Sequence, residues 1–359
     1  MKKEAAEHQD LKSVFTTNLP GILKQFNISL VVSTYQCGKL IFVRNENNTI
    51  NTHFRNFNRP MGVAVKPGRI SVGCLKTVIT YQNIPAVINR LPNPEKHDAC
   101  YVPRYAVDTG AIDIHEMAWG QNNTLWMVNT RFSCLCTLDT EYSFCPQWRP
   151  MFVSGLAPED RCHLNGLGMV NGTPRYATAL GATDVPNGWR ENKRDGGILM
   201  DIARREIIHE HLSMPHSPRW YENRLWMLES GKGTLVCFDP RTGEKKEVAA
   251  MPGFTRGLDF AGPLAFVGLS QVRETATFSD FPLLEALEER ICGVYVCDTR
   301  NGQTIGFIRF EGDVQEIFAV QVLWDTAFPE MLESDDELLN SCYVIPDAAL
   351  REVQYGQDG

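Results

Sequence analysis

Apolar residues along this chain occur in short runs that come in pairs, and the pairs repeat. Three copies share one pattern, an apolar run, a polar turn and a second apolar run that ends in Asp: TLWMVNTRFSCLCTLD (124–139), RLWMLESGKGTLVCFD (224–239) and PLAFVGLSQVRE…GVYVCD (263–298). Apolar runs of about four to eight residues bounded by turn residues are typical of strands. Each copy therefore predicts a β-hairpin.

Three weaker copies complete the series. They are SLVVSTYQCGKLIFVR (29–44), RISVGCLKTVITYQN (69–83) and PRYATALG…GGILMD (174–201), the last with a long turn. A unit that repeats about every 50 residues is typical of propellers and solenoids. Six hairpins predict an all-β fold, a six-bladed β-propeller.

A second set of apolar segments predicts how the ring closes. Five hairpins follow a short strand: MGVAV (61–65), HEMAW (115–119), NGLGM (165–169), HSPRW (216–220) and RGLDF (256–260). The sixth such strand, EIFAVQVL (316–323), has no hairpin after it, and the hairpin at 29–44 has no strand before it. Because a propeller removes exposed edges by pairing its first and last strands, we expect 316–323 to be the innermost strand of a composite blade with 29–44. An open β-solenoid is the alternative.

Closure would make residues 1–359 a single domain, with a short helix in an N-terminal extension (1–28) and loop insertions at 181–196 and 271–292. In a propeller, both insertions would overhang the face on which the innermost strands begin. Uneven loops on a rigid scaffold often carry function. Leu283, Leu284 and Leu287 have helical spacing, which predicts a short helix that acts either as a lid or as a cover for the blade.

Composition and charge narrow the class of protein. With 43% hydrophobic and 22% charged residues, the chain has average globular usage. It contains no apolar run long enough to span a bilayer, and no signal-type core follows MKKEAAEHQD, so we expect a cytoplasmic protein with no membrane partner. A net charge of −8 argues against a nucleic-acid partner. The eleven Cys form no CxxC pair and are expected to be reduced, buried thiols.

Candidate chemistry appears when the innermost strands are aligned on their apolar residues. Their first positions meet near the ring axis, and most are polar: Met61, His115, Asn165, His216, Arg256 and Glu316. His163 lies two residues before Asn165 and so faces the same side of an alternating strand. Glu116 would point away from the axis unless a β-bulge redirects it.

Three imidazoles in successive repeats predict a metal site. Neutral imidazoles suit Zn, Fe or Cu, and three protein ligands with an open position is how catalytic metal sites are built. We therefore expect His115, His163 and His216 to ligate a divalent transition metal. Catalytic roles fall to Arg256, Glu316 and Glu116, with Arg256 as substrate anchor and Glu316 as base or supporting partner. The alternative is that these polar groups satisfy one another and trapped water in an axial channel.

Further polar residues on the same face are candidates for binding a small-molecule or peptide substrate: Asn129, Arg131, Asn165, Asp184, Trp189, Arg190, Glu229 and Arg273. Arg suits a carboxylate because its guanidinium forms paired hydrogen bonds. The leading hypothesis is a metal-dependent lyase, hydrolase or oxygenase. The alternatives are a non-catalytic propeller that binds a ligand or protein, and a structural scaffold.

Several phrases, STYQCGKL, VNTRFSCLCTLD, HLNGLGM, MPHSPRW and PGFTRGLDF, resemble those of a bacterial family of conserved hypothetical proteins without an assigned function. The resemblance runs from Val14 to the closing blade and implies no particular reaction. In architecture alone, the chain is also similar to six-bladed metalloenzymes. The lactonase type holds Ca²⁺ with Glu, Asn and Asp, and the peptidyl-hydroxyglycine lyase type holds Zn²⁺ with three His beside an Arg. The His-rich axis is closer to the second pattern, although neither family's local motifs are present.

Overall fold

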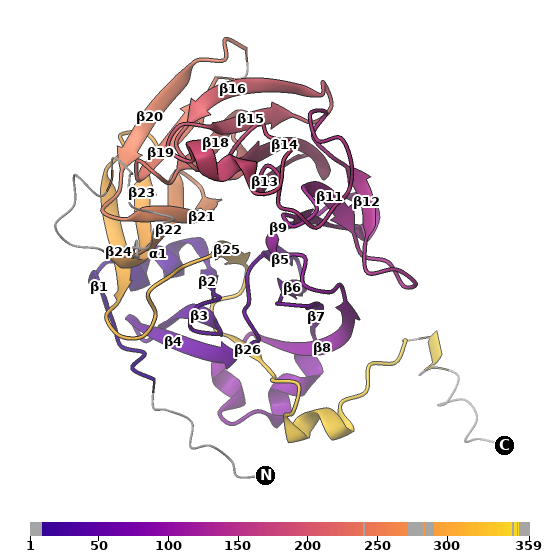
Figure 1. Cartoon of the computed structure of the whole chain (residues 1–359). Coiled ribbons are helices and arrows are strands. Elements are labelled where there is room, and N and C mark those ends of the chain that lie inside the picture. The colour runs from indigo at the N-terminus through magenta and orange to yellow at the C-terminus, as the bar shows by residue number, and fades with distance from the viewer. Residues whose placement is uncertain are drawn as a thin grey trace.

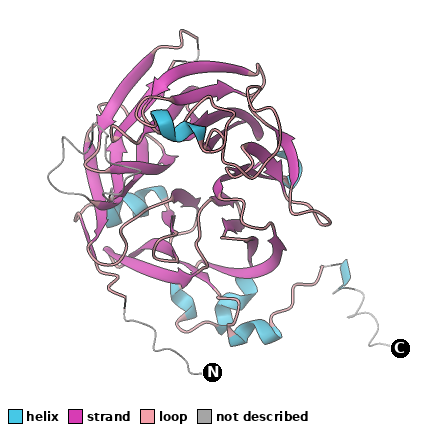
Figure 2. Ribbon diagram, viewed as in Figure 1, coloured by secondary structure: helices cyan, strands magenta, loops and turns pink. Residues whose placement is uncertain are grey.

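Six sheets surround a central axis in the computed structural model, which describes residues 9–239, 241–271, 283, 291–346, 348–349 and 351 (Figures 1 and 2). The prediction of an all-β, six-bladed propeller is confirmed. Among the described helices, none has the length and apolar character needed to cross a membrane.

In each blade the strands run in order from the axis outwards. Blade 1 contains β25 (Ala319–Trp324), β2 (Ile28–Thr34), β3 (Lys39–Glu46) and β4 (Thr49–Asn56). Blade 2 contains β5 (Val63–Lys66), β6 (Arg69–Gly73), β7 (Thr77–Asn83) and β8 (Ala99–Asp108). Blade 3 contains β9 (Ile114–Trp119), β10 (Leu125–Asn129), β11 (Cys134–Thr137) and β12 (Cys145–Trp148).

The remaining three blades complete the ring. Blade 4 contains β13 (Leu164–Val170), β14 (Thr173–Ala179), β15 (Gly197–Asp201) and β16 (Glu206–Leu212). Blade 5 contains β17 (Pro215–Tyr221), β18 (Arg224–Glu229), β19 (Thr234–Phe238) and β20 (Lys245–Ala250). Blade 6 contains β21 (Phe254–Ala261), β22 (Leu264–Ser270), β23 (Cys292–Asp298) and β24 (Thr304–Phe310).

Additional elements lie at the periphery. Strand β1 (Ser13–Phe15) adds to the outer edge of blade 6, and β26 (Pro329–Met331) runs parallel to β8 of blade 2. Helix α1 (Leu19–Phe26) packs into the apolar cluster between blades 6 and 1. Short 3₁₀ helices occupy Pro85–Arg90, Pro94–Lys96, Gln121–Asn123, Gly188–Asn192 and Glu337–Ser341.

Ring closure follows the predicted pairing. Strand β2 pairs antiparallel with β25, from Ile28 opposite Trp324 to Ser33 opposite Ala319. The innermost strands then contact one another in the order β25, β5, β9, β13, β17, β21 and again β25. Strand β25 begins at Ala319, so Glu316 of the predicted strand 316–323 lies in the connection before it.

Face-to-face packing of the blades explains why the hairpins read as continuous apolar runs. Strands β2, β19 and β22 are buried along their whole length. Their two faces meet different neighbours: in blade 1, Val32 of β2 packs towards blade 6, whereas Val31 packs towards blade 2. Strands buried on both faces carry apolar residues at successive positions instead of alternating.

Four of the innermost strands contain a β-bulge near their first residues. The pairing register shifts in β9, β13, β17 and β21, at positions that include His115, Asn165, Ser217 and Arg256. A bulge bends its strand and re-aims side chains. Ser217 and Gly257 accordingly have positive φ values of 51° and 83°. The shift in β9 spans His115 and Glu116, where the sequence required one for Glu116 to face the axis.

Replacing Gly257 should loosen the contact between blades 6 and 1. A Cβ at this position would lie 2.6 Å from the Val320 nitrogen and 2.9 Å from the Ala319 carbonyl carbon, both in β25. Because the positive φ adds backbone strain, we expect Gly257→Ala to lower the free energy of unfolding by about 3 kcal/mol or more. Urea denaturation measures this loss.

Gly68→Ala is the matched control. Gly68 has a φ of +70°, but an alanine methyl at this position would meet no neighbouring atom within 4 Å, so only the backbone strain applies. We expect a loss of about 1 kcal/mol. Equal losses in the two variants would contradict a close approach of β21 to the closing strand.

Candidate functional site

His115 is held by two hydrogen bonds to the same ring nitrogen. Its Nδ1 lies 3.1 Å from the Asp113 carbonyl and 2.8 Å from Oγ1 of Thr130. The Thr130 hydroxyl donates its only hydrogen to the Leu164 carbonyl, at 2.6 Å. Because both neighbours of Nδ1 can therefore only accept, Nδ1 carries the hydrogen.

His216 repeats this arrangement two blades further along the ring. Its Nδ1 lies 2.9 Å from the Met214 carbonyl and 2.9 Å from Oγ of Ser230. The Ser230 hydroxyl donates to the carbonyl of Thr255 in the next blade. In both histidines the neutral ring therefore has Nδ1 protonated and an unprotonated Nε2 that can accept a hydrogen bond.

Burial and nearby positive charge keep both rings neutral. Burial lowers the pKa of His115 well below its ordinary value, and the charges of His163 and Arg256 act in the same direction. Burial likewise lowers the pKa of His216, with Arg256 as the next cause. The two imidazoles are therefore hydrogen-bond acceptors at Nε2 at neutral pH.

Hydroxyl groups at the ends of second strands recur in the ring. Ser33 donates to the Met61 carbonyl at 2.6 Å, and Ser270 donates to the Ile317 carbonyl at 3.0 Å. Like Thr130 and Ser230, each connects its blade to the next one. The repeated endings LVVS, WMVNT, WMLES and FVGLS are the sequence signal for these hydroxyls.

His163 is fixed by a carboxylate and two rings. Its Nδ1 lies 2.8 Å from Oδ2 of Asp160, which also accepts a hydrogen bond from Trp189 Nε1 at 3.1 Å. The His163 ring packs 4.4 Å from Trp189 and 4.7 Å from His115, measured between ring centroids. Asp160 and His163 have positive φ values of 47° and 49°, a backbone conformation that Asp and His adopt more readily than most residues. Sequence reasoning missed Asp160, since nothing in the strand pattern marks it.

Arg256 lies beside these rings, stacked on an aromatic side chain. Its guanidinium carbon is 3.5 Å from the centroid of Phe318, whose ring is 5.2 Å from that of His115. Burial lowers the pKa of Arg256 to about 10, against the charges of Tyr35, Glu316 and Glu116, so it stays charged at neutral pH. With the residues that the structure describes, Arg256 makes no hydrogen bond or ion pair. We call His115, His163, His216, Arg256 and Phe318 the axial cluster.

Below the axial cluster, Glu116 forms an ion pair across the ring. Its Oε1 accepts a hydrogen bond from Arg219 at 2.8 Å, and Glu116 is only 4% exposed. Arg219 also donates to the carbonyls of Leu258 and Pro218. Glu116 therefore already has a partner, and its predicted catalytic role stays a prediction, as does that of Glu316.

The predicted metal ligands His115, His163 and His216 supply the donor type of a metal site, and the metal itself stays a prediction. The Nδ1 bonds of all three His leave Nε2 for a ligand, as second-shell partners do in metal sites. Within the described part of the chain, however, no group of three or more His, Cys, Asp or Glu is arranged to hold a metal ion. The donor type fits Zn, Fe or Cu.

Two predicted substrate-binding carboxylates are engaged with basic side chains. Asp184 accepts hydrogen bonds from the Ser154 amide at 2.9 Å and from Arg161 at 2.8 Å, which lower its pKa to about 2. Burial acts to raise the pKa of Glu229, but hydrogen bonds led by that from Lys245 hold it below its ordinary value. Both groups are ionised and paired at neutral pH.

Three predicted arginines lie apart from the axial cluster or outside the described residues. Arg131 pairs with Asp113 at 3.2 Å. Arg190 lies over the Trp189 ring at 4.4 Å. Arg273 and most of the insertion at 271–292 lie outside the described residues, so the choice between lid and cover stays open.

Two buried asparagines have an unsatisfied donor. Asn165 accepts from Thr178 at 2.7 Å and Asn129 accepts from the Phe132 amide at 3.0 Å, but neither Nδ2 has a partner. A buried unpaired donor costs about 1–3 kcal/mol. Asn165, at the bulge of β13, therefore has a buried donor that no described residue satisfies.

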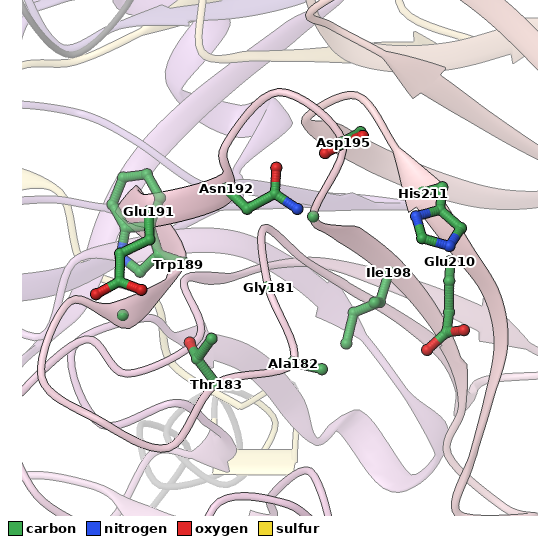
Figure 3. Close-up of a pocket in the computed structure, with 12 residues that line it drawn as sticks. Gly181, Ala182, Thr183, Trp189, Glu191, Asn192, Asp195, Ile198, Glu210 and His211 are labelled. Atoms are coloured by element: carbon green, nitrogen blue, oxygen red, sulfur yellow. The ribbon is translucent and has the colours of Figure 1, made fainter.

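A cavity of about 280 Å³ opens between the first insertion and the end of β16 (Figure 3). Trp189 and Glu191 line one side, and Glu210 and His211 line the other. Trp189 is thus shared between this cavity and His163 of the axial cluster.

The chain belongs to the family described as "Domain of unknown function (DUF4915)", whose sequence model matches residues 17–332. A family without an assigned function was expected, and that part of the expectation is confirmed; bacterial origin stays a prediction. No curated protein sequence matches the chain.

Solved structures are similar in fold alone. A chain in the crystal structure of a nidogen–laminin complex has a TM-score of 0.51 and 10% identity, covering 83% of this chain and 99% of that chain. A protein of unknown function from Bacteroides caccae has a TM-score of 0.47 and 10% identity, covering 82% of this chain and 98% of that chain.

The ring tautomers are directly testable by nitrogen NMR of ¹⁵N-histidine-labelled protein. We expect the His115 and His216 signals to show Nδ1 protonated and Nε2 bare at pH 7. Because unfolded His titrates near pH 6.5, we also expect unfolding free energy to fall below that pH, and less so in a His115→Gln, His216→Gln double variant. An Nε2-protonated pattern would contradict the hydrogen-bond assignment.

Proposed function

We propose that this protein binds a small molecule by its anionic group at the axial cluster, as a ligand-binding propeller. The observation that carries the proposal is Arg256, a partly buried cation whose guanidinium forms no hydrogen bond or ion pair with a described residue. Other charges inside the ring differ in this respect, since Glu116 and Arg219 neutralise one another.

The cation–π contact with Phe318 does not by itself offset the free-energy cost of burying the Arg256 guanidinium. Such a contact contributes about 0.5–2 kcal/mol. Withdrawing an ion from water costs several kcal/mol even after relaxation. A carboxylate or similar anion would supply the missing charge and would suit the paired donors of a guanidinium.

Neighbouring groups favour the same kind of ligand. His115 and His216 are neutral, so they place no competing positive charge beside Arg256, and Asn165 retains an unpaired amide donor. The rings of Phe318 and Trp189 are only 4% exposed each and supply an apolar surround. An anion gains more from a hydrogen bond in such surroundings than in water.

Arg256→Gln should remove anion binding. In wild-type protein we expect acetate to raise the midpoint of thermal unfolding, relative to chloride at equal ionic strength. Loss of a charge-assisted hydrogen bond should weaken acetate affinity about tenfold or more. Calorimetric titration and thermal unfolding measure the two effects.

Arg309→Gln is the matched control for that variant. Arg309 also stacks on an aromatic ring, 4.3 Å from the centroid of Phe307, but it belongs to the outer strand β24. We expect its acetate response to equal that of wild type. An equal loss in both variants, or an unchanged response in Arg256→Gln, would contradict the proposal.

A metal-dependent enzyme is the second candidate. The observation in its favour is that His115, His163 and His216 all use Nδ1 for hydrogen bonds within the protein. The positive charge of Arg256 and the lack of a preformed set of three ligands among the described residues weigh against it.

Elemental analysis of untagged protein separates the two candidates. The metal candidate predicts about one equivalent of Zn, Fe or Cu in wild type, lost in a His115→Ala, His216→Ala double variant. His216→Ala alone should lower metal content with little loss of fold. Absence of metal from wild type would remove this candidate, and anion binding does not require any metal.

A further inference from the structure

The two axial imidazoles specify more about the ligand than its charge. We infer that the ligand is a hydroxycarboxylate, whose carboxylate binds Arg256 and whose hydroxyl donates to Nε2 of His115 or His216. The inference rests on the proposed function and adds the hydroxyl donor to it. Its basis is two series of hydrogen bonds, through Thr130 and through Ser230, which determine that Nε2 is the accepting nitrogen in each ring.

Each series runs in one direction and ends at a carbonyl of the next blade. Thr130 uses its hydrogen for the Leu164 carbonyl, and Ser230 uses its hydrogen for the Thr255 carbonyl. Each hydroxyl oxygen can then only accept from the imidazole. The same nitrogen also faces a second carbonyl, of Asp113 or Met214, so two independent acceptors hold each tautomer.

The axial cluster therefore contains two hydrogen-bond acceptors and one cationic donor. The bare Nε2 atoms of His115 and His216 cannot bind a carboxylate oxygen, because acceptor would meet acceptor. They can accept a hydrogen bond from an O–H or N–H of a ligand. Arg256 requires an anion, so a ligand that satisfies the cluster carries both kinds of group.

The charge of Arg256 selects a hydroxyl over an ammonium. The Arg256 guanidinium lies 3.5 Å from the centroid of Phe318, whose ring is 5.2 Å from that of His115, so a donor bound at His115 would lie near this cation. A ligand ammonium there would meet this cation, while neither imidazole carries a neutralising charge. A hydroxyl supplies the hydrogen without the repulsion.

Wild-type protein alone tests the inference with three probes of similar size. Glycolate has a carboxylate and a hydroxyl, methoxyacetate has the oxygen without its hydrogen, and acetate has neither. We expect calorimetric titration in the presence of EDTA to show glycolate binding about fivefold more tightly than the other two, as one added hydrogen bond allows. Glycine, with an ammonium, should bind more weakly than glycolate.

Replacing the imidazoles of His115 and His216 tests whether they cause the preference for glycolate. In a His115→Phe, His216→Phe double variant, we expect the preference for glycolate over acetate to fall to about one. The control is His209→Phe, on the outer strand β16, where the ring packs on Phe238. It should keep the preference. Circular dichroism reports whether the variants fold, and the wild-type comparison stands without them.

The outcomes separate this inference from the proposed function. Equal affinity for all three probes, still lost in Arg256→Gln, would overturn the hydroxycarboxylate and leave anion binding intact. No saturable binding of any probe, or binding that ignores Arg256, would overturn both. Glycolate binding that occurs only without EDTA would overturn both in favour of a metal-bound ligand.

Discussion

The antiparallel pairing of β2 with β25 is the constraint on which the rest of the molecule depends. It joins two parts of the chain almost 300 positions apart, Ile28 to Trp324, and so turns a row of hairpins into a ring. Only in a closed ring do six innermost strands converge on one axis. Closure therefore builds the scaffold and also brings together side chains from β9, β17, β21 and the start of β25.

Convergence of the innermost strands brings polar side chains together inside the ring, where they are satisfied in two ways. Deeper in the ring, Glu116 and Arg219 form a buried pair whose charges cancel. Where the innermost strands begin, β-bulges interrupt the pairing beside His115 and His216, and the hydroxyls of Thr130 and Ser230 hold the two imidazoles. Arg256 is the exception to this internal pairing among the described residues. An unpaired cation inside such a network is where a ligand is expected.

Much of the fold was predictable from the sequence, because strands buried on both faces leave continuous apolar runs. Ring closure was predictable because the strand at 316–323 lacked a hairpin and the hairpin at 29–44 lacked a preceding strand. The convergence of His115, His163 and Arg256 also followed from that alignment. Phe318 and Asp160 did not, because the first reads as an ordinary apolar strand residue and the second lies in a loop. The tautomers required atomic contacts, since Thr130 and Ser230 act through carbonyls of neighbouring blades. Proline or glycine after the axial position, as in HSP and TRG, was an available signal for the bulges.

The measurement that tests the central claim most directly is a crystal structure of the protein grown with glycolate. We predict that the glycolate carboxylate lies within about 3 Å of the Arg256 guanidinium and that its hydroxyl lies at a similar distance from Nε2 of His115 or His216. Glycolate bound away from Arg256, or a metal ion coordinated by the three histidines, would contradict it.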